Sequence, residues 1–322
     1  MALPSGVLTA KPGLVKPQKL DLSPKPRRMV WPTARPDAEV RSSGISRESL
    51  KTTIDNIGKT PRLIFDSADS TSYVGSGQEF NSIGTSADSF DLGNTSGASS
   101  DDPTFVGIAD AYDDGTYFSF DGGDNFQDEG GLETWMNGCH KSTAGVWTVC
   151  MLMLYEPGAR QGLWSWNANG TGADRVGGSF IIETVSTTPT YAGKVQIWVG
   201  KSTGETDVFY QIVDDGFLDT EPMMLASVCD NGGSSTSFFY KNGEYLTVDG
   251  GNDTYSASYN SHTANSVNPM CIGCLSRAGY GNYGHLTNGS KFYSGFFDDT
   301  AWTKAELDLI WARVGGWLLA SS

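Results

Sequence analysis

Residues 292–314, FYSGFFDDTAWTKAELDLIWARV, constrain the fold most because their periodicity changes from that of a strand to that of a helix. The first half alternates residue by residue and is aromatic, which is typical of a strand. Thr303 and Glu306 then have the spacing of a capping box, in which each side chain bonds the other's backbone N–H. Four apolar residues follow at helical spacing: Leu307, Ile310, Trp311 and Val314. The stretch predicts a strand followed by one short helix that ends at Gly315.

Short strands joined by turns dominate the rest of the chain. With 40 Gly among 322 residues, 11% aromatic and 18% charged residues, the composition favours a packed β protein over a disordered chain. Asn242-Gly243 is the strongest hairpin signal. Strands are predicted over 116–120, 146–155, 162–166, 180–185, 194–200, 207–213, 223–229, 237–240, 245–248, 270–273 and 292–297. Their number and spacing predict an all-β sandwich.

The N-terminal third is organised differently. A short helix is predicted over 46–57, capped by Ser46 or Ser49 and ended by Gly58, and a short strand over 62–66. Residues 67–102 are rich in Ser, Gly and Asp and are predicted to be loops with brief strands. We therefore divide the chain into an arm (1–45), a helix with a connecting segment (46–102) and a sandwich (103–322).

Residues 1–45 form a basic arm that contains seven of the thirteen prolines. Proline favours an extended, polyproline II-like chain. Residues 1–41 carry eight Lys and Arg against three Asp and Glu, which gives a charge of +5. Because the net charge of the whole chain is −15, the remaining residues together carry −20. We expect the arm to lie along a partner protein, with Lys25, Arg27, Arg28 and Trp31 in contact. The acidic body should repel nucleic acid.

Several strings match a known family. The strings MMLASVCDNGGSSTSFFYKNGEYL, MCIGC and YSGFFDDTAWTKAELDLIW resemble, in this order, the hairpin and closing strands of laminin-G-like (concanavalin A-like) jelly rolls. TYFSFDGGDNF and GVWTVCMLMLYE resemble earlier strands of the same family. The resemblance covers about residues 103–315 and implies a jelly-roll β-sandwich with a short C-terminal helix.

A narrower resemblance lies in SYVGSGQEFNSIG, DPTFVG, FDGGDNF and GCHKSTAGVWT, which are similar to tailed-phage virion proteins that carry such a domain behind an N-terminal extension. It implies a non-enzymatic capsid decoration or cement protein on the particle exterior. The implied partners are the major capsid protein or other virion proteins and further copies of the chain. The alternative is a lectin-like tail or head adhesin that binds a host surface glycan, with or without calcium.

Calcium is the one metal for which candidate ligands are apparent, and no resident cofactor is expected. Many laminin-G-like domains bind calcium at a rim, and the ion prefers six to eight oxygen ligands. FDGGDNFQDEGG offers Asp121, Asp124, Asp128 and Glu129, of which Asp124 and Asp128 are the best candidates. Asp298 and Asp299 are further acidic residues. The alternative is ordinary turn chemistry, because Asp and Asn readily bond the backbone of turns.

Two other chemistries are disfavoured. A retaining glycosidase needs two carboxylates about 5–5.5 Å apart, and neither Asp128-Glu129…Glu133 nor Asp214-Asp215…Asp219 has the spacing of such a pair on one strand. A zinc site at Cys271 and Cys274 lacks a second ligand pair, and in a strand the two side chains would face opposite sides.

The odd count of five Cys is typical of reduced, buried thiols.

Glycan binding would use exposed aromatic rings. Trp164 and Trp166 alternate onto one face, which favours the core, so Tyr280 and Tyr283 are the better glycan-contact candidates. No stretch has the roughly 20 apolar residues of a membrane span. The N-terminus lacks the apolar core of a signal peptide, so secretory export is not expected.

Overall fold

The computed structural model describes residues 47–113, 115–128, 135–136, 139, 145–158, 160–165, 178–183, 194–199, 208–213, 222–229, 238–246, 269–275 and 284–315. The chain divides into two compact units, Met1–Arg35 and Pro36–Ser322, and all described residues lie in the second. None of the described helices is both long and apolar enough to cross a membrane.

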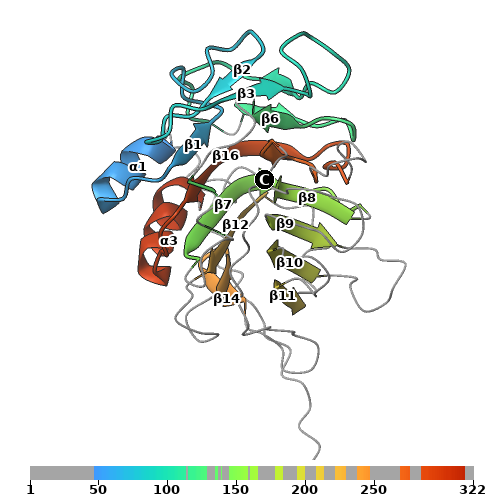
Figure 1. The fold of residues 1–322 in the computed structure, drawn as a ribbon. Helices are drawn as coiled ribbons and strands as arrows, with labels where there is room; N and C mark the ends of the chain where they lie inside the picture. The colour runs from blue at the N-terminus through green and yellow to red at the C-terminus, as the bar shows by residue number, and fades with distance from the viewer. Residues whose placement is uncertain are drawn as a thin grey trace, which may run out of the picture. The chain divides into compact units, whose positions relative to one another are not determined.

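Two antiparallel sheets of eight strands each form a sandwich (Figure 1). The first sheet has the order β14 (Glu244–Leu246), β13 (Phe238–Lys241), β12 (Pro222–Cys229), β7 (Trp147–Leu154), β16 (Lys291–Asp298), β5 (Tyr117–Ser119) and β4 (Thr104–Val106), with β1 (Leu63–Asp66) also on β16. The second has the order β11 (Val208–Val213), β10 (Lys194–Val199), β9 (Gly178–Glu183), β8 (Arg160–Ser165), β15 (Cys271–Ile272), β6 (Phe126–Asp128), β3 (Ser89–Leu92) and β2 (Glu79–Asn81). The predicted all-β sandwich is confirmed.

Aromatic side chains fill the space between the sheets. The rings of Phe80, Phe118 and Phe126 lie 5.0–5.1 Å apart, centroid to centroid, and join strands of both sheets. Trp164 is fully buried in the same cluster, as its alternation predicts. Rings at these separations make offset or edge-to-face contacts, which add to the free energy gained from burial.

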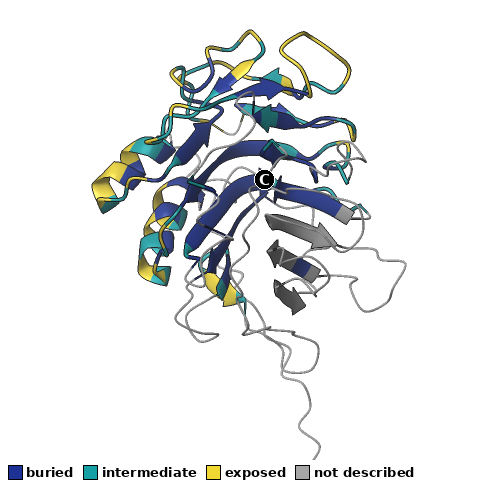
Figure 2. Cartoon of the chain, viewed as in Figure 1, coloured by how far each residue is buried: buried dark blue, intermediate teal, exposed yellow. Residues whose placement is uncertain are grey.

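Two helices cover the outer face of the first sheet. α1 (Leu50–Ile57) and α3 (Lys304–Ile310) lie against each other and place their apolar sides on the outer residues of β7, β12 and β16, while their exposed sides point outward (Figure 2). Leu307 and Ile310 are fully buried, and the capping box of Thr303 and Glu306 is present, as predicted. Because both faces of β7 and β12 are covered, these strands are apolar except for the buried Thr148 and Ser227. A single wide turn, η3 (Trp311–Gly315), extends α3.

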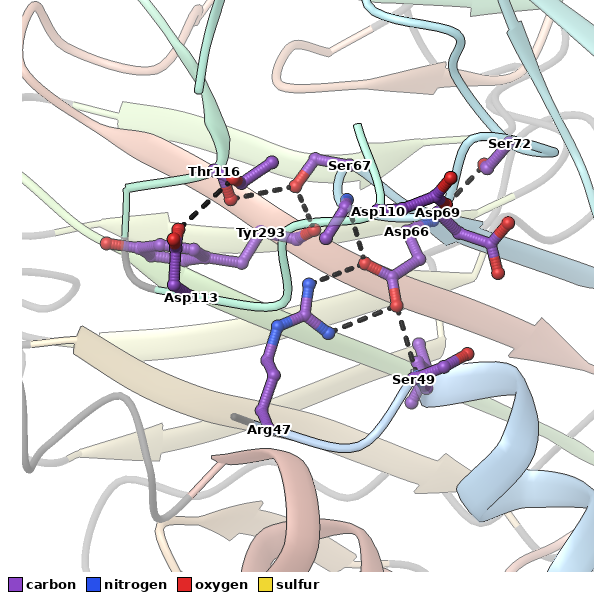
Figure 3. A network of polar contacts seen from close by, with 12 residues as sticks. Arg47, Ser49, Asp66, Ser67, Asp69, Ser72, Asp110, Asp113, Thr116 and Tyr293 are labelled. Carbon is purple, nitrogen blue, oxygen red and sulfur yellow. Dashed lines mark hydrogen bonds and ion pairs between the residues drawn. The ribbon is translucent and has the colours of Figure 1, made fainter. Parts of the chain in front are cut away.

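A buried network attaches α1 to β1 (Figure 3). The Asp66 carboxylate accepts two hydrogen bonds from the Arg47 guanidinium and further bonds from the backbone N–H groups of Leu50 and Ala68. Ser67 Oγ donates to the carbonyl of Tyr293 at 2.7 Å, which ties the end of β1 to β16. The predicted helix therefore begins at Leu50 with Ser49 as its N-cap, and Gly58 ends it in the left-handed conformation.

Residues 46–102 contribute three strands to the sandwich. β1 pairs with β16 in the first sheet, whereas β2 and β3 pair with each other and β3 pairs with β6 in the second. The sequence suggests a connecting segment here because these strands are only three or four residues long and are set among Ser, Gly and Asp. Their apolar residues, such as Phe80 and Phe90, belong to the core between the sheets.

Candidate functional site

α1 and α3 cover the outer face of the first sheet. A polar site can therefore form on the second sheet and on its loops. Two loops, residues 93–102 and 121–125, meet beside His285 at one end of β6. The backbone N–H of Asn125 donates to the carbonyl of Asp101 at 3.2 Å, and the N–H of Gly93 donates to the carbonyl of Asn125 at 2.7 Å. We call Asn94, Asp101, Asp121, Asp124, Asn125 and His285 the acid–amide site.

The loop FDGGDN owes its shape to its two aspartates. Asp124 Oδ2 accepts a hydrogen bond from the N–H of Asp121 at 2.7 Å, and Asp121 Oδ1 accepts one from the N–H of Gly123 at 3.0 Å. Gly122 has a φ of 101°, which side-chain-bearing residues rarely adopt. Nδ1 of His285 lies 3.2 Å from the carbonyl oxygen of Asp124. The turn chemistry considered for this loop is therefore present.

The facing loop is folded around Asp101. Its carboxylate accepts hydrogen bonds from the backbone and side chain of Asn94 and from Ser99 Oγ. Partial burial opposes ionisation of Asp101, but these hydrogen bonds outweigh it and lower its pKa. Asp101 is therefore an anion at neutral pH.

Two buried acceptor atoms at the centre of the site have no hydrogen-bond partner within the described part of the chain. Asp124 is 2% exposed and Asn125 is fully buried, and in each residue Oδ1 accepts nothing. Burial, followed by repulsion from the Asp121 and Asp101 carboxylates, raises the pKa of Asp124 to about 7. Asp124 thus changes charge near neutral pH, and a bound hydrogen-bond donor would satisfy its Oδ1.

A polar row on the second sheet continues from the site. The register places Glu79 opposite Asp91, Asp91 opposite Gln127, and Gln127 opposite Cys271. Directly opposite residues share a face, so this row lies on the side away from the phenylalanine core. Gln127 Nε2 donates to the carbonyl of Asn94 at 3.3 Å, which joins the row to the acid–amide site. Glu79 is exposed and Gln127 is partly exposed.

Charge on the described residues is segregated. Residues 93–102 and 121–125 contain four aspartates and neither Lys nor Arg. The cations that form ion pairs on the described surface lie around the helices: Lys51, Lys59, Arg62, Lys304 and Arg313. An anionic ligand would be repelled at the acid–amide site. A neutral, hydroxyl-rich ligand would not be repelled, and its hydroxyl groups would find acceptors in Oδ1 of Asp124 and Oδ1 of Asn125.

The two best calcium candidates do not come together. Asp124 lies in the loop before β6 and Asp128 is the last residue of β6, where it faces the same way as the buried Phe126. A strand advances about 3.3 Å per residue, so the two carboxylates lie at opposite ends of β6. Among the described residues, no group of three Asp, Glu, His or Cys is placed to hold a metal ion. Glu129 lies outside the described residues.

The other acidic candidates have structural partners. Asp298 Oδ2 accepts a hydrogen bond from Trp302 Nε1 at 2.7 Å, and Asp299 forms an ion pair with Arg62 at 2.8 Å. Both fix the segment between β16 and α3. The predicted arm contacts Lys25, Arg27, Arg28 and Trp31 and the glycan candidates Tyr280 and Tyr283 lie outside the described residues. In the sequence, Tyr283 precedes His285 by two positions.

Sequence patterns do not single out Asn94, Asp101 and His285 as site residues. These residues reach the acid–amide site because β3 pairs with β6 and because the chain returns to Asp124 at His285. Neither arrangement can be predicted from the residues next to it in the sequence. The only hint was the density of Asn, Ser and Asp in residues 94–102, which is also typical of an ordinary loop.

The fold defines the chain as an all-β sandwich. A solved binding domain of botulinum neurotoxin serotype D in complex with N-acetylneuraminic acid is similar, with a TM-score of 0.51 and 8% identity over 81% of this chain and 52% of that chain. The botulinum neurotoxin DC binding domain in complex with SialylT gives a TM-score of 0.50 and 7% identity, over 80% of this chain and 52% of that one.

The chain thus spans about half the length of these structures, and at such low identity the likeness concerns the fold alone. A carbohydrate-binding domain, CBM40, of a Ruminococcus gnavus sialidase bound to α2,3-sialyllactose gives a TM-score of only 0.38 with 16% identity, over 52% of this chain and 82% of that one. Neither a scan against protein-family models nor a search of curated proteins finds a match.

Proposed function

We propose that this chain is a non-enzymatic glycan-binding module whose ligand is a neutral, hydroxyl-rich sugar. The observation that carries the proposal is the acid–amide site, where Asn94 and Asp121 are exposed above Asp124 and Asn125, whose Oδ1 atoms lack hydrogen-bond partners. Sugars are bound through paired hydroxyl contacts to carboxylates and amides. The similar fold of two binding domains in complex with sialic-acid ligands supports the class of ligand without specifying the sugar.

The charge of the site decides between sugar classes. Sialic acid carries a carboxylate, and the carboxylates of Asp101 and Asp121 would repel it. We therefore expect discrimination in favour of neutral hexoses or N-acetylhexosamines. Gln127 is partly exposed and donates to the carbonyl of Asn94, so it offers a polar contact to a second sugar unit.

The test is binding of the full chain to an array of neutral and sialylated glycans, followed by titration calorimetry with the best ligand. Asn94→Ala and Asp121→Asn should weaken binding at least tenfold, which corresponds to the loss of about 1.4 kcal/mol. Asp55→Asn on α1 changes charge equally at a distant exposed position and should leave affinity unchanged. Preference for sialylated ligands, or no neutral ligand bound at millimolar concentration, would refute the proposal.

Whether Tyr280 and Tyr283 stack on the sugar can be tested in the same assay. Replacement of either tyrosine by leucine removes the π-face but retains apolar volume. A loss of affinity in Tyr283→Leu with an unchanged affinity for Asp55→Asn would assign the stacking contact. Equal affinities for both tyrosine variants and the unmodified chain would remove these residues from the site.

A second candidate function concerns the basic arm. We propose that the chain is carried on the outside of a phage particle, anchored by residues 1–45. Seven prolines lower the entropy lost when the arm becomes ordered on a partner, and its charge of +5 suits an acidic track. Lys25, Arg27, Arg28 and Trp31 are the proposed contacts to the major capsid protein or another virion protein.

Co-sedimentation with particles that lack this chain tests the arm. The chain without residues 1–45 should no longer sediment with particles, and the triple change of Lys25, Arg27 and Arg28 to alanine should weaken attachment most at low salt, where charge contacts are least screened. Trp31→Ala should weaken it at all salt concentrations. If the truncated chain binds particles with unchanged affinity, the anchoring role is excluded, whatever the glycan assay shows.

A further inference from the structure

One edge of the first sheet carries an exposed apolar surface. β4 is the last strand on that side, and among the described residues its only strand partner is β5. Val74 lies in the loop after β1 and Ile108 in the loop after β4, and their side chains are 71% and 73% exposed, more than any other large apolar residue in the described ranges. We call Val74, Phe105, Val106, Ile108 and Ala109 the edge surface.

The two loops that form the edge surface pack against each other. Gly75 lies so close to its neighbours that a Cβ atom there would be 3.7 Å from the ring of Phe105 and 3.9 Å from Cβ of Ala109. Oδ1 of Asp110 accepts a hydrogen bond from the backbone N–H of Ser70 at 2.9 Å. The exposed apolar side chains therefore belong to one continuous surface and are not scattered singly.

β4 also offers backbone groups at this edge. In an antiparallel pair, every second residue directs its N–H and C=O away from the partner strand. Within the described part of the chain, no backbone hydrogen bond joins Thr104, Phe105 or Val106 to a segment other than β5. An edge strand flanked by exposed apolar side chains readily pairs with a further chain, and proteins usually cover such edges. We therefore expect a further segment to cover β4.

The chain that precedes the described residues starts beside this surface. The backbone N–H of Arg47 donates to the carbonyl of Tyr112 at 3.1 Å, and the N–H of Ala111 donates to the carbonyl of Ile108 at 3.0 Å. Arg47 is thus held one short turn away from Ile108, next to the loop that carries Asp113 (Figure 3).

The preceding segment is long enough to reach along β4. Residues 36–46 belong to the same compact unit as the sandwich. Eleven extended residues span about 36 Å at about 3.3 Å per residue, whereas β4 has only three residues. The segment can therefore pass Ile108 and continue along the whole strand.

We propose that residues 36–46 cover the edge surface of the same molecule, with their backbone paired to β4 and Ile45 packed on Ile108. The segment PDAEVRSSGIS contains two β-branched apolar residues, Val40 and Ile45, which favour an extended conformation. Pairing supplies main-chain hydrogen bonds, and burial of the exposed apolar side chains stabilises the contact further. Because the segment is joined to Arg47, it loses less translational freedom on pairing than a separate molecule would.

The charge around the edge surface suits this segment. Residues 68–75 and 104–113 contain three aspartates and neither Lys nor Arg, and Asp110 is exposed. Arg41 is the only cation of residues 36–46, and the two acids of the segment lie at the end farthest from Arg47. Opposite charges therefore face each other where the segment passes the two loops. The inference leaves residues 1–35 available to a partner and does not depend on glycan binding.

Hydrogen exchange of the full chain, read by peptide mass spectrometry, tests the pairing. Amides of residues 40–46 should exchange at least about tenfold more slowly than those of an unpaired peptide of the same sequence, at every protein concentration. Ile108→Asp should remove this protection. Tyr245→Asp, at an exposed apolar position on the opposite edge of the same sheet, should leave it unchanged. Exchange of residues 40–46 at the unpaired rate in the unmodified chain, or protection that rises with protein concentration, would overturn the proposal.

A cross-link identifies the occupant. All five native cysteines are buried thiols, so cysteines introduced at the surface can be paired selectively. The double variant Ile45→Cys with Ile108→Cys should form a disulfide within one molecule, whereas Ile45→Cys with Tyr245→Cys should not. A disulfide that joins two molecules would assign the edge surface to a second copy and contradict the proposal. The exchange measurement on the unmodified chain needs no variant, so a variant that fails to fold leaves the test intact.

Discussion

Arg47 and Asp66 form a buried two-pronged ion pair, in which Nη2 lies 2.6 Å from Oδ1 and Nη1 lies 3.1 Å from Oδ2. The same carboxylate accepts the N–H groups of Leu50 and Ala68, so it orients the start of α1 and the turn after β1 together. Arg47 also lies over the ring of Tyr112, 5.3 Å from its centroid. This pair therefore joins the start of α1 to the end of β1.

Removal of either partner should destabilise the fold strongly. Arg47→Ala leaves the Asp66 carboxylate buried without its cation, and loss of one partner of a buried pair costs about 3–5 kcal/mol. The free energy of unfolding in urea measures this cost. Lys51→Ala, which breaks the exposed ion pair with Asp55 at 2.6 Å, should cost less than about 1 kcal/mol. Similar values for the two variants would contradict the role assigned to Arg47.

Asp124 should make the sandwich less stable as the pH rises from about 4 to 7. Burial raises its folded-state pKa to about 7 from an ordinary 3.8, so in this range the folded chain binds more protons than the unfolded one. Below pH 4 the ionisation of Asp124 does not reduce the free energy of unfolding. This free energy falls as the pH rises from 4 to 7 and does not change further through Asp124 above pH 7. Asp124→Asn cannot ionise and keeps an acceptor for the N–H of Asp121.

Urea unfolding of both proteins between pH 4 and 8 tests this. The stability of Asp124→Asn relative to the unmodified chain should increase by at least about 1 kcal/mol across that range, since one unit of pKa shift corresponds to about 1.4 kcal/mol. The difference between the two free energies of unfolding at each pH removes the effect of the other carboxylates, which titrate in both proteins. A difference that does not change with pH would contradict the raised pKa.

Gly273→Ala should strain the chain directly after β15. An alanine Cβ would lie 2.6 Å from a ring carbon of Phe120, and the φ of 85° is strained for any side-chain-bearing residue. We expect destabilisation of about 2–3 kcal/mol by urea unfolding. Gly97→Ala, at an open position in the loop of residues 93–102, is the control and should be nearly neutral.

Thr303→Ala should destabilise the chain by about 1 kcal/mol, because Thr303 Oγ1 accepts the N–H of Glu306 at the start of α3. Thr303→Ser retains that hydroxyl and should restore nearly all of the stability. Urea unfolding of the two variants measures the difference. Equal losses in both would mean that the methyl group, and not the capping hydrogen bond, matters at this position.

Local patterns made much of the fold predictable. The Asn242-Gly243 turn joins β13 to β14 with φ values of 49° and 94°, as that dipeptide predicts, and the capping box begins α3. These features depend on residues within four positions of one another. The apolar alternation likewise placed Trp164 in the core.

Long-range pairing could not be predicted in the same way. β2 and β3 are short and polar at many positions, so their place beside β6 has no periodic signal. The acid–amide site needs that pairing to bring Asp101 to Asp124. Gly273 accounts for the other difference: the strand predicted over 270–273 covers only Cys271–Ile272, because Gly273 has a φ of 85°, and nothing in MCIGC distinguishes such a glycine from one within a strand.

The position of β16 also governs when the sandwich can form. β1 has β16 as its only strand partner among the described residues, and β16 separates β7 from β5 in the first sheet. Some 230 residues lie between β1 and the strand that completes its pairing, and contacts so distant in sequence slow folding. During synthesis β1 must therefore remain without this partner until β16 has left the ribosome.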